Sequence, residues 1–136
     1  MQVQADLHEF ERRGVRLVAV GQGTGDEAAH YCGKLGASFP CLGDPDRSAY
    51  QGLALRRGTW WSVVGKALLT QPAETIRRIR EADLEAARLA ATDVLQLGGV
   101  AIVEQGGTMR FLHVAESPDD IPPNTEIFSA LDQLAA

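Results

Sequence analysis

The first half of the chain alternates between helix-like and strand-like runs of apolar residues. Residues 3–13 carry apolar side chains at helical spacing, and Gly14 follows where such a helix would end. Residues 15–20 are nearly continuous in apolar character, as in a strand covered on both faces. A second helical stripe ends before Gly36, and a short strand is predicted at 39–42. Because a helix between two strands normally makes a right-handed crossover, we predict that these strands lie side by side and parallel.

The middle of the chain is less regular. A short helix is predicted at about 47–53, and residues 56–69 then form an apolar patch that contains both tryptophans, Trp60 and Trp61. Pro72 stands at a position typical of the first turn of a helix, and the amphipathic pattern after it predicts a long helix.

The last third of the chain predicts a β-hairpin and a closing helix. Residues 98–103 and 108–114 are rich in apolar residues, and the two glycines between them favour a short turn. Two prolines then introduce a final helix, whose core-facing positions are expected to be Ile127, Phe128, Leu131 and Leu134. The order of the elements predicts an α/β fold.

The composition indicates a single domain and argues against membrane and nucleic-acid partners. The 136 residues, 45% of them hydrophobic and 23% charged, fit one globular domain spanning 1–136. The apolar runs fall short of the roughly 18 residues that a membrane span needs, and no secretory signal opens the chain, so we expect a cytoplasmic protein without membrane contact. The net charge of −5, with arginines interleaved among acids, argues against a nucleic-acid partner.

The two cysteines, Cys32 and Cys41, are the candidate redox residues. Cys32 lies on the apolar stripe of its helix, which favours a buried and inert thiol, whereas Cys41 lies in an edge strand and faces either a helix or an active-site loop. A helix packed on a sheet separates backbones by roughly 7–8 Å, beyond the roughly 4.4–6.8 Å between the Cα atoms of a disulfide. We therefore expect both cysteines to remain thiols.

Cofactor and metal chemistry find little support in the sequence. Three glycines follow the first predicted strand, but Asp26 replaces the third glycine of a dinucleotide fingerprint, so a plain turn is expected. The histidines His8, His30 and His113 show no ligand spacing with one another or with the cysteines. We predict neither a bound cofactor nor a metal site.

Three segments in this order resemble the AhpC/TSA peroxiredoxin-like family, and most closely the branch that contains the prostamide/prostaglandin F synthases. They are residues 10–21, residues 39–46 and residues 97–110, within a resemblance that covers about 5–134. The resemblance implies a thioredoxin-like fold, with a mixed four-stranded sheet flanked by helices and a helical insertion at about 56–93.

The resemblance also implies where the family's chemistry lies. The reactive cysteine of such proteins stands at the start of the first helix, where the helix dipole lowers the thiol pKa. No cysteine precedes Cys32, so we expect a chain that is truncated at its N-terminus and lacks the nucleophile. The segment before the third strand would line the active site, where Gln96 either hydrogen-bonds a substrate oxygen or is an exposed loop residue.

A central strand would also be missing, between the strands at 15–20 and 100–103. Either the native protein is longer, or the two inner strands close against each other, or a partner chain fills the gap. We expect the first for the native protein and the second for these 136 residues.

The functional expectation is a peroxiredoxin-like thiol redox protein that reduces a peroxide or a related substrate with a thiol reductant, and that is inactive in this form. The alternative is a non-catalytic binding or dimerisation module. Its homodimer would form through Trp60, Trp61 and the exposed strand edges.

Overall fold

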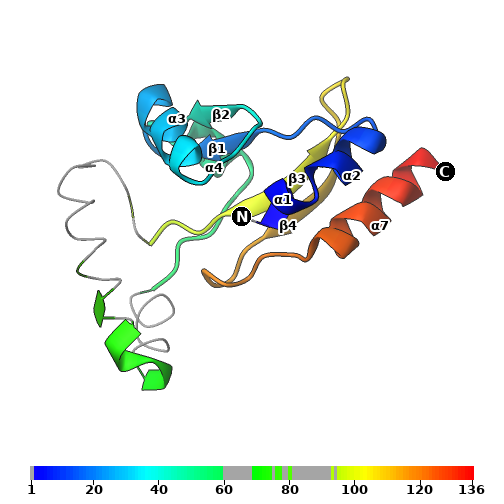
Figure 1. Cartoon of the computed structure of the whole chain (residues 1–136). Coiled ribbons are helices and arrows are strands. Elements are labelled where there is room, and N and C mark those ends of the chain that lie inside the picture. Colours follow the sequence, from blue (N-terminus) through cyan, green and yellow to red (C-terminus); the bar gives the residue numbers. More distant parts are fainter. Residues whose placement is uncertain (1, 60–68, 75, 78–79, 81–92, 94) are drawn as a thin grey trace.

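The chain is described by a computed structural model that covers residues 2–59, 69–74, 76–77, 80, 93 and 95–136 (Figure 1). Trp60, Trp61 and most of the helix expected after Pro72 lie outside the described residues. Residues 72–74, 76–77 and 80 are helical, as the sequence pattern predicts.

The N-terminal region forms two short helices instead of the one that was predicted. α1 spans Gln2–Ala5 and α2 spans Leu7–Arg12, with a turn at Asp6 between them. Gly14 follows α2 with a φ of +71°, a backbone conformation that favours glycine, so the predicted end of the helical region is confirmed.

β1 (Ala19–Gly21), α3 (Gly25–Lys34) and β2 (Cys41–Gly43) form the first sheet and its covering helix. β1 and β2 are parallel neighbours, with Ala19 opposite Cys41, as predicted. The predicted strand at 15–20 is shorter in the structure, because residues 15–18 are not part of a strand ladder. α3 lies against this pair of strands (Figure 1).

Backbone contacts and caps fix α3 in this position. Thr24 caps its first turn through a capping box with Glu27, and Gly36 follows it with a φ of +66°. A Cβ atom on Gly43 would collide with the backbone of Thr24 and Gly25, so the end of β2 packs directly on the start of α3. The short helix α4, Ser48–Gly52, comes next.

β3 (Gly99–Val103) and β4 (Met109–Val114) form the predicted antiparallel hairpin. α7 (Asn124–Ala135) ends the fold and runs beside the hairpin together with α2 (Figure 1). Ile127 of α7 is buried, as expected, but Leu134 is 42% exposed, so its assignment to the core was wrong. It lies in the last turn of the helix.

The α2–α7 contact contains the best-buried side chain of the described residues. Phe10 is 1% exposed and its ring centroid lies 4.8 Å from that of Phe128. The Arg13 guanidinium lies over the Phe128 ring, 4.5 Å from its centroid, and hydrogen-bonds Asp132 at 2.8 Å. Apolar burial and a cation–π contact therefore join the two ends of the chain.

The described strands form two sheets of two strands each, not the expected four-stranded sheet. β1 and β3 do not pair, so the expected closure of the inner strands does not occur. The chain before β3 pairs instead with an earlier segment, through an antiparallel bridge between Arg57 and Gln96. On β1, the carbonyl oxygen of Val20 accepts a hydrogen bond from the Tyr50 hydroxyl at 3.0 Å.

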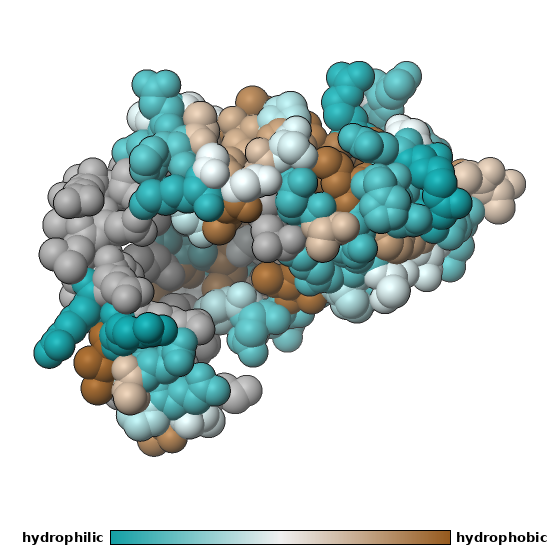
Figure 2. Space-filling model, viewed as in Figure 1, coloured by the Kyte–Doolittle hydropathy of each residue, from teal (hydrophilic) through white to brown (hydrophobic). Residues whose placement is uncertain are grey.

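One face of the β1–β2 pair is exposed. Val18, Val20 and Leu42 are 48%, 41% and 53% exposed, and Val20 and Leu42 are opposite each other in the register. Figure 2 shows hydrophobic atoms reaching the surface among polar residues on the visible side of the molecule. An apolar strand surface of this kind is typical of an interaction site.

Candidate functional site

The two cysteines of the chain are joined. Cys32, near the C-terminal end of α3, forms a disulfide bond with Cys41, the first residue of β2, and their Cα atoms are 6.5 Å apart. The expectation that both remain thiols was therefore wrong. Small residues explain the close approach, since Ala28 is the buried residue of α3 and Gly43 lets β2 meet the helix backbone.

Neither half of the disulfide is deeply buried. Cys32 and Cys41 are both of intermediate exposure, so the expectation of a fully buried Cys32 was also wrong. Tyr31, next to Cys32 on α3, and Leu35, the C-cap of the helix, are exposed. Both cysteines of the disulfide are therefore partly accessible to solvent.

A buried carboxylate follows β2 directly. Asp44 accepts hydrogen bonds from the backbone and hydroxyl of Ser48, at 3.0 and 2.9 Å, and from the backbone of Ala49 at 2.9 Å. Burial acts to raise the pKa of Asp44, but these hydrogen bonds outweigh it and hold the pKa below its ordinary value. The charged carboxylate thereby caps α4.

A second acidic residue links the loop after β1 to the approach to β3. The backbone of Asp93 exchanges hydrogen bonds with the side-chain amide of Gln22, at 3.0 and 3.2 Å. Its carboxylate pairs with Arg47 and Arg57, each at 2.8 Å. Burial acts to raise the pKa of Asp93. The hydrogen bonds from Arg57 and Leu95 and the charges of Arg57 and Arg47 outweigh burial and hold this pKa below its ordinary value.

Gln96, the candidate substrate-binding residue, lies beside this cluster. Its side-chain nitrogen donates hydrogen bonds to the carbonyl oxygens of Arg56 and Leu97, both at 3.0 Å. A substrate oxygen would have to replace one of these acceptors. Substrate binding by Gln96 stays a prediction.

Gln96 also lines a cavity of about 400 Å³ that contains a histidine–aspartate pair. His113 Nε2 lies 3.0 Å from Asp120 Oδ1, and the other oxygen of Asp120 accepts a hydrogen bond from the Glu116 backbone at 2.8 Å. The sequence pattern suggests nothing for His113 beyond an unlikely metal ligand. No periodicity links a strand residue to a loop residue seven positions later, so this pair was missed.

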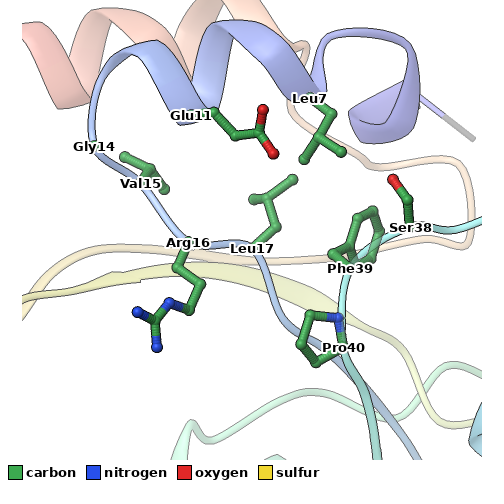
Figure 3. A pocket seen from close by; sticks show the side chains of 9 residues that line it. All are labelled: Leu7, Glu11, Gly14, Val15, Arg16, Leu17, Ser38, Phe39 and Pro40. Carbon is green, nitrogen blue, oxygen red and sulfur yellow. The ribbon is translucent and has the colours of Figure 1, made fainter.

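A second cavity, of about 360 Å³, lies between α2 and the segments that lead into β1 and β2 (Figure 3). Leu7, Leu17 and Phe39 supply apolar side chains to it, and the carboxylate of Glu11 lies beside them (Figure 3). The redox candidates Cys32 and Cys41 do not line either cavity.

Comparison with known proteins decides the family. The sequence model of the AhpC/TSA antioxidant enzyme family matches residues 2–117. The chain belongs to this family. The thioredoxin-like AhpC/TSA assignment made from sequence resemblance is thereby confirmed.

A curated relative supports the same assignment. The chain is 36% identical over 95 residues to a prostamide/prostaglandin F synthase from Salmo salar. The aligned segment covers 65% of this chain and 44% of the relative, so the chain spans less than half of that relative's length. No solved structure gives a significant match.

The described residues contain no group of three or more histidine, cysteine or acidic side chains arranged to hold a metal ion. Among the helices that the structure describes, none combines the length and apolar character that a membrane crossing requires.

Proposed function

We propose that this AhpC/TSA family member is a cytoplasmic, peroxiredoxin-like thiol redox protein, and that Cys32 and Cys41 are its redox couple within these 136 residues. The observation that carries this proposal is the disulfide between the two cysteines, both of which are partly exposed. The family supports thiol redox chemistry. The oxidised substrate is a peroxide or a related compound, and the electron donor is a dithiol.

Reduction of the couple proceeds by thiol–disulfide exchange. A thiolate of the dithiol attacks one sulfur of the disulfide and releases the other cysteine, which takes up a proton. The second thiol of the reductant then attacks the mixed disulfide, releases the second cysteine and leaves as a cyclic disulfide. Two electrons and two protons move from the dithiol to Cys32 and Cys41.

Oxidation returns these electrons to hydrogen peroxide. One cysteine thiolate attacks a peroxide oxygen, which yields a sulfenic acid and, after proton uptake, one water molecule. The second thiol then condenses with the sulfenic acid, so the disulfide forms and a second water leaves. Neither Cys32 nor Cys41 stands at the start of a helix, where a thiol pKa is lowered most, so we expect this step to be slow.

The test uses the 136-residue protein after reduction with dithiothreitol. Hydrogen peroxide should restore one intramolecular disulfide per chain, detected as loss of two alkylation sites by mass spectrometry. Cys32→Ser and Cys41→Ser should each form none. Steady-state peroxide consumption should stay at the thiol background because the oxidation step is slow, and a failure of the pair to re-form the disulfide in hydrogen peroxide would refute the proposal.

A second candidate function is a non-catalytic dimerisation module. The exposed face made by Val18, Val20 and Leu42 favours it, because an apolar strand surface of this kind is normally covered by a partner. A second copy of the chain would cover this face and the open strand edges, with Trp60 and Trp61 contributing to the contact. The thioredoxin-like sheet would then be completed between β1 and β3.

A further inference from the structure

The helix α3 is attached to the rest of the fold by few buried side chains. Ala28 is its one buried residue, Tyr31 in its second half is 58% exposed, and Leu35, which caps its C-terminal end, is 42% exposed. Among the described elements, α3 contacts mainly β2. Apolar burial therefore contributes little to holding the second half of this helix.

The two halves of α3 are held by different interactions. At the start, the Thr24–Glu27 capping box and the close backbone approach of Gly43 hold the first turn. Near the C-terminal end of α3, the disulfide between Cys32 and Cys41 links the helix directly to β2. The chain after the helix is also tied to α1, since the Ser38 N–H donates a hydrogen bond to Gln4 Oε1 at 2.9 Å.

We propose that the Cys32–Cys41 disulfide is a redox-controlled clasp for the second half of α3. In the oxidised protein the disulfide holds residues 30–37 on β2, and reduction by a dithiol releases them. This inference rests on the proposed function only for the thiol–disulfide exchange that opens the disulfide. In that exchange two electrons and two protons pass from the dithiol to the two cysteines.

Release of α3 would spread to β2 but not to the rest of the fold. β1 and β2 have three residues each, and a two-stranded sheet is at best marginally stable without a covering element. The β3–β4 hairpin and α7 have their own contacts, with Ile127 buried and Phe128 packed on Phe10. The redox state of the clasp would therefore control local order around the β1–β2 sheet.

Hydrogen exchange read by mass spectrometry tests the clasp in the full 136-residue chain. Amides in peptides covering 30–37 should exchange about 30- to 1,000-fold faster in the reduced protein than in the oxidised protein, a range set by the usual contribution of a disulfide to stability. Peptides from 109–114 and 124–135 are internal controls and should not change.

The double variant Cys32→Ser/Cys41→Ser separates the clasp from the redox function. It should exchange like the reduced wild type, and adding reductant should not alter it. Equal exchange of 30–37 in oxidised wild type and in this variant would overturn the clasp, even if the cysteines cycle normally. If the wild-type disulfide resists dithiothreitol while the variant exchanges rapidly, the disulfide holds α3 permanently, and both the proposed redox function and the redox control of the clasp are refuted. Faster exchange in the control peptides as well would indicate global unfolding and would also overturn the local clasp.

Discussion

Phe10 shows how much stability a single side chain can carry in this protein. It is 1% exposed and packs on Phe128, which joins the N-terminal helix pair to the C-terminal helix. Phe10→Ala should lower the free energy of unfolding by about 3–5 kcal/mol, through lost burial and the cavity left behind. Urea denaturation measures this value. Leu134→Ala, at a 42% exposed position of α7, should change it far less, and equal effects would contradict this account of the core.

Asp44 should make stability depend on pH. Hydrogen bonds hold its pKa below the ordinary value in the folded chain, so its stabilising effect is complete above about pH 4 and is lost as the pH falls below that. Asp44→Asn keeps one acceptor but loses the charge. The variant should be less stable near neutral pH and should lose less stability than the wild type on acidification.

Urea denaturation from about pH 7 to about pH 3 provides the measurement for Asp44. Glu11→Gln is the matched control, because the Glu11 side chain is exposed and makes no hydrogen bond or ion pair with the described residues. Glu9 is a second carboxylate with a lowered pKa, because hydrogen bonds from Arg12 and Arg13 bring its pKa to about 2. An identical acid dependence in the wild type and in Asp44→Asn would show that Asp44 is not a source of the pH effect.

At the scale of elements, two glycines should respond in opposite directions to the same substitution. A Cβ on Gly43 would meet the backbone of Thr24 and Gly25, so Gly43→Ala must displace α3 from β2. We expect a loss of about 1–3 kcal/mol in the free energy of unfolding. Gly33 lies within α3 with open space around it, and Gly33→Ala should add about 0.5–1 kcal/mol.

Thermal unfolding of the oxidised protein distinguishes the two glycines. Gly43→Ala should melt below the wild type and Gly33→Ala above it. A Gly43→Ala protein as stable as the wild type would mean that the strand and the helix can separate without loss. In that case the packing of β2 on α3 would not determine the position of Cys41 relative to Cys32.

At the scale of the whole molecule, the described strands form two separate sheets, and Val18, Val20 and Leu42 beside or on the first sheet are exposed. We expect the protein to self-associate, because an exposed apolar strand surface favours pairing with another chain. Sedimentation velocity over a range of concentrations measures this. Val20→Lys should shift the protein toward monomer, since it puts a charge on the exposed face of β1.

Leu134→Lys is the matched control for the association, because Leu134 is exposed to nearly the same extent as Val20 but lies at the end of α7. It should associate like the wild type. A wild-type protein that remains monomeric and melts cooperatively at high temperature would contradict the proposed dimer. The sheets would then be stable without a partner.

Several features of the fold could be predicted from the sequence because they depend on near neighbours along the chain. The helix ends at Gly14 and Gly36 were expected, and both glycines have positive φ angles. The parallel β1–β2 pair follows from the handedness of a strand–helix–strand connection, and the hairpin follows from the glycine turn between two apolar runs. Local sequence order also carried the family resemblance, which the comparisons confirm.

Only the tertiary structure decided the redox pair, the sheet arrangement and the histidine–aspartate contact. The disulfide depends on a Cα separation of 6.5 Å between α3 and β2, which is set by small residues packed between them. β1 and β3 lie in separate sheets, the segment before β3 pairs with Arg57, and His113 meets Asp120 where the chain turns back after β4. Such distances are properties of the packed chain, because the spacing of residues along a sequence constrains their separation in space only within a single element.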